Sequence, residues 1–250
     1  MGIVAGLLAA WLGYNMGGWL MAVPLALVGA AIGTSARYAA IRQKYIWDAQ
    51  FAAVAQKHGW TMETDLKDGP QGLLPGFIPF SRGHGSVAHR CLQGTKEGMR
   101  FWVMDAAYTT GSGKSTQVHP VCAVLFEAPF SLTLSIQGET AGHKLVDALG
   151  GADIDFEDDR FSRQFWVQSP DRRTAYDVLH PKTLQFLQDL GADWTWHWVG
   201  AKVMMARHGK LQPSDCEALI TQAGVFVALL PRHLVSDRRA AVRASPFSAI

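Results

Sequence analysis

The chain has 250 residues, of which 48% are hydrophobic, and its 23 Lys and Arg residues stand against 21 Asp and Glu. This hydrophobic content is enough to bury a core, which excludes an intrinsically disordered chain, and the length favours one domain with an appendage over two full domains. The three cysteines, at positions 91, 122 and 216, are too few for a disulfide scaffold and form no CxxC pair.

The N-terminal region is free of charge: the first 36 residues contain no Asp, Glu, Lys, Arg or His. A transmembrane helix needs about 20 apolar residues, so we predict a membrane hairpin of two short helices, at 3–14 and 19–40, that turns at 15–18. Aromatic residues crowd around the turn, as they do at a membrane interface. Two alternatives stay open. Either only the later segment crosses the membrane while the first lies shallow or is re-entrant, or the stretch is a buried helix pair of a soluble protein.

Basic residues set the predicted orientation. Arg37, Arg42 and Lys44 follow the apolar stretch directly, and no charged residue precedes it. Because basic residues are retained on the cytoplasmic side, residues 1–44 are predicted to anchor the chain in a bacterial inner membrane, which residues 3–40 contact, with the following domain in the cytoplasm. Three unpaired cysteines also suit a reducing compartment.

Residues 45–231 are predicted to form an α+β domain. An amphipathic helix at 45–58 comes first, followed by a Gly- and Pro-rich loop at 64–79. Runs rich in β-branched and aromatic residues predict strands at 86–92, 100–109, 117–126, 130–136, 161–168, 193–199 and 202–207. Further helices are predicted at 140–149, 181–190 and 214–230. Strands joined by hairpins, with helices at the ends, favour a mainly antiparallel sheet with peripheral helices.

Charge is distributed unevenly along the chain. Residues 45–231 carry 16 Lys and Arg against 20 Asp and Glu, and a mildly acidic domain argues against nucleic acid as a partner. Residues 232–250 carry four Arg and one Asp and are predicted to form a basic flexible tail. Such a tail is expected to be a solvated end, and contact with anionic lipid headgroups is the alternative.

The segment TGSGKST resembles the second half of a phosphate-binding loop of the Walker A type. In such a loop Gly111, Gly113, Lys114 and Ser115 would hold phosphate and magnesium. A phosphate- or nucleotide-binding enzyme that uses this loop, with a carboxylate from 153–159 on a metal, is therefore one hypothesis for the function.

Two features of the flanking sequence favour a plain hairpin turn at the same place. The Walker pattern needs Gly at the position of Tyr108 and a helix directly after the loop, whereas Pro120 and β-branched residues follow here. Glycines between two apolar runs are typical of a hairpin turn.

No metal site, cofactor or catalytic residue is predicted. The acidic run at 153–159 has Asp158 and Gln164 where an EF-hand needs its sixth-position Gly and twelfth-position Glu, so a solvated edge or turn is favoured. The nine histidines form no HExxH or Cys/His ligand spacing, and His84 with His89 would need a third ligand from elsewhere. No set of acid, base and nucleophile stands out.

Trp194, Trp196 and Trp198 alternate along a predicted strand, so all three side chains project from one face. Three large apolar rings in register favour a core or a sheet face sealed by a helix. A weaker alternative is an interaction surface that binds a base, a sugar or a side chain of a partner.

Several motifs occur in a fixed order within residues 1–230. After the apolar hairpin and the amphipathic helix come Phe101–Asp105, the TGxGK turn, Gly151–Phe156, Phe161–Val167 and the stretch from Asp171 to Pro181. This combination resembles bacterial membrane-anchored proteins that carry a cytosolic domain of unknown function. The resemblance implies no activity and no catalytic residue, and it supports the interpretation of residues 111–115 as a turn.

The first hypothesis for the function is therefore a non-enzymatic, membrane-tethered cytosolic domain that binds another membrane or cytosolic protein, or acts as a scaffold at the inner membrane face. The second is the phosphate-handling enzyme described above. The third is a lipid-binding domain, which would need an apolar cavity in the sheet.

Overall fold

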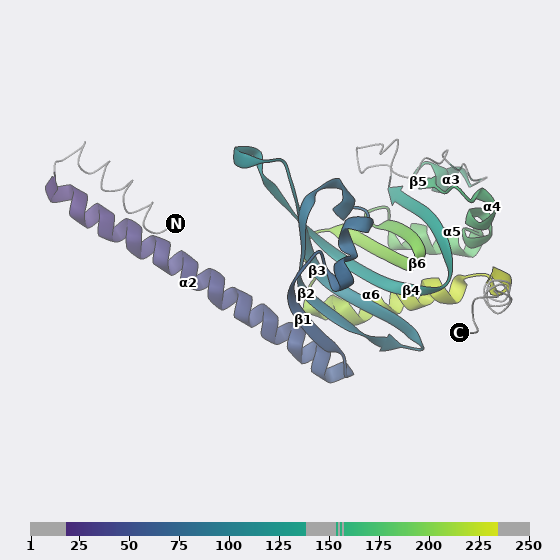
Figure 1. Cartoon of the computed structure of the whole chain (residues 1–250), viewed down its shortest axis with the longest axis horizontal. Coiled ribbons are helices and arrows are strands. Elements are labelled where there is room, and N and C mark those ends of the chain that lie inside the picture. Colours follow the sequence, from purple (N-terminus) through teal and green to yellow (C-terminus); the bar gives the residue numbers. More distant parts are fainter. Residues whose placement is uncertain (1–18, 139–153, 155, 157, 235–250) are drawn as a thin grey trace, which may run out of the picture. The chain divides into compact units, whose positions relative to one another are not determined.

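The computed structural model describes residues 19–138, 154, 156 and 158–234. The chain divides into two compact units, residues 1–52 and 53–250. The second unit contains a six-stranded antiparallel sheet with helices, which confirms the predicted α+β class with a mainly antiparallel sheet (Figure 1).

The prediction of an N-terminal transmembrane hairpin is wrong. Helix α2, Trp19–His58, is one helix of 40 residues. It does not end at residue 40 but continues through Arg42 and Lys44, so the segment predicted as the second arm is part of a longer, charged helix. No helix that the structure describes is both long enough and apolar enough to cross a bilayer. The predicted first arm at 3–14 and the predicted turn at 15–18 lie outside the described residues.

The sheet has the order β1-β2-β3-β4-β5, and β6 also pairs with β4. The strands are β1 Thr61–Lys67, β2 His84–Lys96, β3 Met99–Thr110, β4 Gln117–Gly138, β5 Phe165–Gln168 and β6 Thr195–His208. Four α-helices come after β4 in the described part of the chain. They are α3 Asp159–Ser162, α4 Arg172–Val178, α5 Pro181–Leu190 and α6 Cys216–Leu229. Short 3₁₀ helices are η1 Pro70–Gly72, η2 Leu74–Gly76, η3 Phe80–Arg82, η4 Gly113–Ser115 and η6 Pro213–Asp215.

Local sequence explains the tight hairpin between β2 and β3. Lys96 pairs with Met99, which leaves Glu97 and Gly98 as a two-residue turn. Both residues have positive φ, at 51° and 80°. This is the backbone of a type I′ turn, whose twist matches that of the two strands, and Gly98 adopts it without strain.

One face of the sheet packs against the segment 70–82, which carries the first three 3₁₀ helices. Its side chains Leu74, Phe77 and Phe80 lie in one buried cluster with apolar side chains of β2, β3, β4 and β6. Phe80 meets Tyr108 of β3 edge-on, with ring centroids 5.9 Å apart. Because side chains alternate along a strand, the members from β3, β4 and β6 come from every second position.

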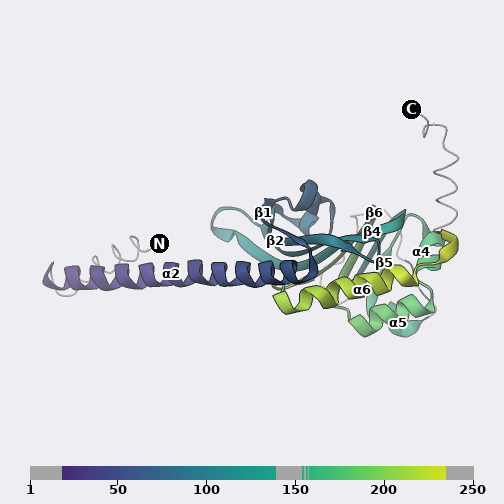
Figure 2. The same cartoon turned by 90° about the horizontal axis from the view of Figure 1, so that it is seen from below.

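The opposite face packs against α5 and α6. Phe226 of α6 lies 4.7 Å from Trp196 and 6.2 Å from Phe126 between ring centroids, and Phe186 of α5 lies 6.1 Å from Trp196. Figure 2 shows α5 and α6 on one side of the sheet and the 3₁₀ segment on the other. The domain is thus three layers, with a packed core on each side of the sheet.

Strand β4 bends in its middle. Its first half pairs with β3 and its last residues pair with β5, while β6 follows it along both halves. The register with β6 shifts between the pairs Glu127↔Lys202 and Leu132↔Gly200, so residues 128–131 stand opposite Ala201 alone. Such a bulge bends a sheet locally. The strands predicted separately at 117–126 and 130–136 are therefore one bent strand.

Candidate functional site

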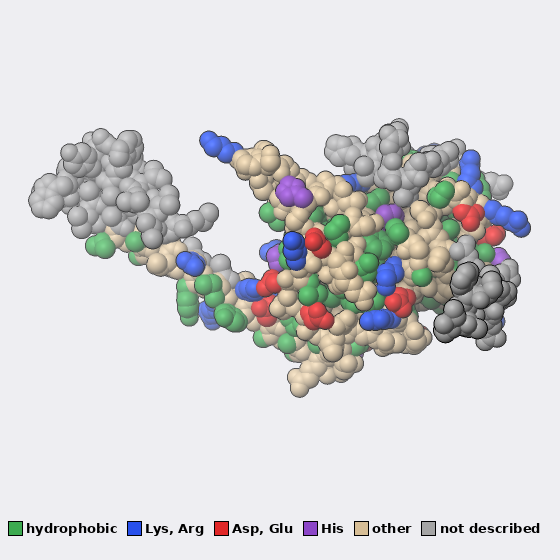
Figure 3. All heavy atoms as spheres, viewed as in Figure 1, with side chains coloured by type: hydrophobic (Ala, Val, Ile, Leu, Met, Phe, Trp, Pro, Cys, Tyr) green, Lys and Arg blue, Asp and Glu red, His purple; other side chains and the backbone are tan. Residues whose placement is uncertain are grey.

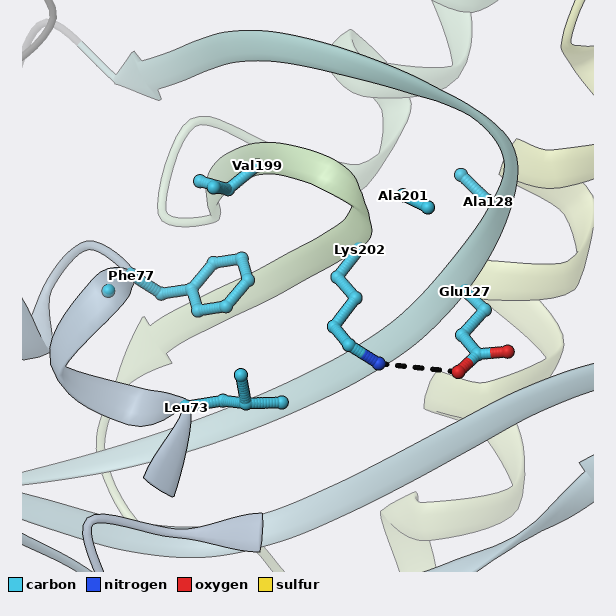
Figure 4. Close-up of a pocket in the computed structure, with 8 residues that line it drawn as sticks. Leu73, Phe77, Glu127, Ala128, Val199, Ala201 and Lys202 are labelled. Atoms are coloured by element: carbon cyan, nitrogen blue, oxygen red, sulfur yellow. Dashed lines mark hydrogen bonds and ion pairs between the residues drawn. The ribbon is translucent and has the colours of Figure 1, made fainter. Parts of the chain in front are cut away.

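A hollow of about 400 Å³ opens beside the bulge of β4 (Figure 4). It is lined by Leu73, Gly76, Phe77, Glu127, Ala128, Val199, Ala201 and Lys202. All but two of these residues are apolar or glycine, and the exceptions, Glu127 and Lys202, form an ion pair at one side. The hollow can therefore take an apolar group next to a charged one.

The hollow lies where the register of β4 and β6 shifts, and Ala128, Val199 and Ala201 from this region line it. Gly200 has φ +60° and allows β6 to turn sharply there. Val199, directly before it, is 39% exposed, which is high for a large apolar side chain in a central part of the fold. The exposed carbon of Val199 and Ala201 forms one wall, and Phe77 and Leu73 approach it from the 3₁₀ segment, as Figure 4 shows.

Hydrogen bonds to the buried side chains His197 and Gln137 hold in place the second wall, which Leu73 and Phe77 form. The backbone N–H of Ile78 donates a hydrogen bond to His197 Nδ1 over 3.0 Å, and the Phe77 ring meets the His197 ring edge-on at 5.7 Å between centroids. Arg82 Nη2 donates to Gln137 Oε1 over 2.6 Å. The segment that carries Phe77 is therefore fastened to β6 and to the second half of β4.

His197 is neutral at neutral pH. Its side chain is buried, and burial lowers the pKa of His197 to about 4 because the charged ring would lose its hydration. Since Nδ1 accepts the hydrogen bond from Ile78, the proton of the neutral ring lies on Nε2. The uncharged state is the one that keeps the wall attached.

Glu127 and Lys202 line one side of the hollow, and Arg100 extends this row of charges beyond it. Lys202 Nζ lies 3.3 Å from Glu127 Oε1. Phe101 pairs with Phe126, so Arg100 on β3 neighbours Glu127 on the side away from Lys202. Both cations lie 4.8 Å from the centroid of the buried Trp102 ring. Two cations and one carboxylate give this row a formal charge of +1, and the cation–π contacts hold the cations over the ring.

The predicted phosphate-loop residues lie elsewhere, at the tip of the β3–β4 hairpin. Thr110 pairs with Gln117 across the end of the hairpin. Gly111, Gly113, Lys114 and Ser115 are all exposed. Ser115 Oγ donates to the Ser112 carbonyl over 2.9 Å.

Strand β4, rather than a helix, comes directly after this loop. The segment therefore lacks the helix N-terminus whose N–H groups contribute to a Walker A site. Among the described acidic residues of the run 153–159, Asp158 accepts hydrogen bonds from the backbone N–H groups of Arg160 and Phe161. It serves as the N-cap of α3, while residues 153, 155 and 157 lie outside the described part of the chain.

Trp194, Trp196 and Trp198 are 4%, 3% and 1% exposed. Trp198 packs on Phe130 at 4.9 Å between centroids, and the Arg207 guanidinium lies 4.8 Å from the Trp194 ring centroid. An interaction surface made of these rings would need them exposed, whereas here they fill the core.

The cysteines and histidines form no reactive or metal-binding cluster among residues 19–138, 154, 156 and 158–234. All three thiols are buried, and burial raises the pKa of Cys91 to about 12, of Cys122 to about 11 and of Cys216 to about 12. At neutral pH they are protonated and therefore poor nucleophiles. His89 lies 3.4 Å from Asp65, and the two make an exposed pair.

The residues of the hollow were not found by sequence reasoning. Leu73 and Phe77 fall in a segment predicted only as a loop, Glu127 directly follows the predicted strand 117–126, and Lys202 is the first residue of the predicted strand 202–207. The one local signal was Gly200, where two predicted strands met. Its positive φ marks the bulge.

No family model matches the chain, and no curated protein matches it. Among solved structures, the chain is similar to the crystal structure of the mycobacterial trehalose monomycolate transport factor A, TtfA. The sequence identity is 11% and the TM-score is 0.47, and the similarity covers 73% of this chain and 95% of that one.

Proposed function

We propose that the sheet domain is a non-catalytic binding domain for an anionic amphiphile. The apolar chain of the ligand lies in the hollow between Phe77 and Val199, and its acidic head lies beside Arg100 and Lys202. The observation that carries the proposal is the apolar hollow lined on one side by Lys202 and Glu127, with Arg100 on β3 as the next charge beyond Glu127.

The apolar part of the site supports a small ligand. Its volume of about 400 Å³ falls within the range of about 300–1,000 Å³ that small-molecule sites occupy. A bound hydrocarbon chain would cover the exposed side chain of Val199. Burial of apolar surface contributes about 25 cal/mol per Å² to the free energy of binding. The apolar hollow thus contributes the affinity for the hydrocarbon chain of the ligand.

The charge row supports an acidic head. Glu127 balances the charge of one of the two cations, Arg100 and Lys202. These three side chains therefore keep one net positive charge, which attracts a carboxylate or phosphate. The Lys202 side chain is 25% exposed and its Glu127 partner 42% exposed. Partial burial strengthens a charge-assisted hydrogen bond relative to one in bulk water.

Calorimetric titration of the full chain with monomeric myristate and with its methyl ester tests the proposal. We expect saturable binding of myristate and weaker binding of the uncharged ester. Val199→Glu should weaken myristate binding at least about tenfold, because the new carboxylate would be buried beneath the hydrocarbon chain of the bound myristate. Lys202→Gln should weaken myristate but not ester binding, by about tenfold.

Two matched variants control for general effects of charge. Val118 is 65% exposed at the far end of β4, and Lys182 is exposed on α5. Val118→Glu and Lys182→Gln should leave myristate binding unchanged. If neither myristate nor its ester binds the wild-type chain, or if Val118→Glu weakens binding as much as Val199→Glu, the proposal is wrong.

The openness of the hollow favours one second candidate, the protein-binding domain predicted from the sequence. Val199 remains 39% exposed, so an apolar side chain of a partner protein could insert there. This candidate predicts that neither myristate nor the ester binds the wild-type chain. The same titration therefore distinguishes the protein-binding domain from the amphiphile-binding domain.

A further inference from the structure

Helix α2 carries positive charge without negative charge over most of its length. From Trp19 to Trp47 the sequence has no Asp or Glu. Arg37, Arg42 and Lys44 lie within this stretch, and Arg37 and Arg42 are exposed. The surface of this part of the helix is therefore cationic, and it attracts anionic partners.

Large apolar side chains are exposed on the same stretch. Leu27, Tyr38, Ile41 and Tyr45 are 67%, 70%, 47% and 71% exposed. Their spacings of 11, 3 and 4 residues correspond to about three turns, one turn and one turn of an α-helix, so the four side chains share one face. We call these four residues the apolar stripe. Figure 3 shows hydrophobic side chains next to Lys and Arg side chains along the described part of this helix.

The basic residues flank the apolar stripe. At about 100° per residue, Arg42 lies on one side of Tyr38 and Arg37 lies on the other. Arginine side chains beside an apolar stripe can extend their guanidinium groups to the lipid headgroups. Their aliphatic stems and the neighbouring apolar side chains then stay in the more apolar layer of the membrane. Within the segment 37–45, exposed aromatic and aliphatic side chains flanked by basic ones are a feature shared with helices that lie in a membrane interface.

We propose that the apolar stripe of α2 binds the surface of an anionic lipid bilayer, with Arg37 and Arg42 paired to lipid headgroups. Charge complementarity favours this occupant over a second copy of the chain. Two copies packed through the stripe would bring six basic residues, Arg37, Arg42 and Lys44 of each, against only two acidic ones, Asp48 of each, which is unfavourable. The proposal is independent of the amphiphile site.

Co-sedimentation of the full chain with vesicles tests it. The vesicles contain either phosphatidylcholine alone or phosphatidylcholine with about 30% phosphatidylglycerol, which gives a negative surface. We expect binding to the anionic vesicles to exceed binding to the neutral ones. Raising the salt from about 0.1 M to about 1 M should reduce the difference, because it shortens the Debye length from about 10 Å to about 3 Å.

Two pairs of substitutions separate the basic and apolar contributions. Arg37→Gln with Arg42→Gln should weaken partitioning into anionic vesicles about 30-fold, the effect of two basic residues lost from an anionic surface. Tyr38→Gln with Tyr45→Gln should weaken partitioning into both kinds of vesicle.

The matched controls lie in the other unit. Arg160→Gln with Lys182→Gln makes the same charge change at exposed positions, and Val225→Gln removes an exposed apolar side chain from α6. These controls should leave partitioning unchanged. Equal binding to neutral and anionic vesicles, or the same loss in the control pair as in the arginine pair, would overturn the proposal.

Discussion

Ile78 and His197, which are 119 positions apart in the sequence, are joined by a hydrogen bond of 3.0 Å from the Ile78 backbone N–H to His197 Nδ1. This bond ties the segment that carries Phe77 to strand β6, and so fixes the distance between the two apolar walls of the hollow. Because the acceptor is a neutral imidazole, protonation of Nδ1 would remove this bond.

The first prediction concerns this protonation. The pKa of His197 is lowered by burial from 6.5 to about 4, so the unfolded state binds more protons than the folded state between these values. The contribution of His197 to stability is therefore complete above pH 6.5 and is lost as the pH falls toward 4. We expect a loss of up to about 3 kcal/mol over this window.

Urea unfolding at several pH values measures this effect, with His197→Asn as the comparison. Asn keeps an acceptor near the position of Nδ1 but does not titrate. The difference in unfolding free energy between the wild type and the variant should shrink or reverse as the pH falls from 6.5 to 4. Parallel curves for the two proteins would show that His197 does not titrate in this way.

The hairpin tip at residues 111–115 should tolerate substitution. Lys114→Ala and Ser115→Ala each change an exposed side chain, so the free energy of unfolding should stay within about 0.5 kcal/mol of the wild type. Calorimetric titration with ATP and magnesium should show no saturable binding by either the wild type or Lys114→Ala. Binding by the wild type that Lys114→Ala abolishes would restore the phosphate-loop hypothesis.

Trp196 should be a large contributor to stability. Its ring is 3% exposed and contacts Phe226 of α6 at 4.7 Å between centroids. Trp196→Ala should lower the unfolding free energy by about 3–5 kcal/mol, because it removes a buried ring and leaves a cavity. Val225→Ala, at an exposed position of α6, is the control, and a similar loss in both variants would place Trp196 outside the core.

A buried ion pair gives another stability prediction. Arg90 Nη1 lies 2.7 Å from Asp105 Oδ2, and the two side chains are 10% and 6% exposed. Asp105→Ala should cost about 3–5 kcal/mol of unfolding free energy, because it leaves a guanidinium buried without its carboxylate. The double variant Arg90→Met with Asp105→Leu should recover much of this loss, as measured by urea unfolding. A double variant no more stable than Asp105→Ala would contradict the account of the pair.

Local sequence was sufficient for elements whose signals lie within a few residues. Pro181 at the first position and the spacing of Leu184, Leu187 and Leu190 predicted α5 with the bounds that the structure has. Runs of β-branched and aromatic residues predicted the three strands of the β2–β3–β4 meander, although β2 extends to Lys96, beyond the predicted end at residue 92.

Features that depend on pairing between distant strands were not predicted. The break seen near residues 127–130 suggested two strands, but β6 pairs with β4 on both sides of the bulge and keeps it one strand. The same holds for Gly200, which separates the predicted strands 193–199 and 202–207 but lies inside the single strand β6. Positions opposite a bulge are fixed by register, which local sequence does not encode.

The candidate site was missed for the same reason. Phe77 lies in an irregular segment without periodicity, and its neighbour His197 was one of nine scattered histidines. Only the folded chain places Phe77, Val199 and Lys202 around one hollow. The three tryptophans attracted attention in the sequence because they are large and regularly spaced, and that spacing turned out to reflect the packing of a core face.

The binding of an amphiphile in the hollow is tested most directly by NMR titration of the isotope-labelled chain with a fatty acid that carries a nitroxide on its hydrocarbon chain. Paramagnetic broadening should appear first at the amides of Gly76, Phe77 and residues 199–202, and Val199→Glu should abolish it. Broadening that begins at other parts of the domain, or that persists unchanged in Val199→Glu, would contradict the proposed site.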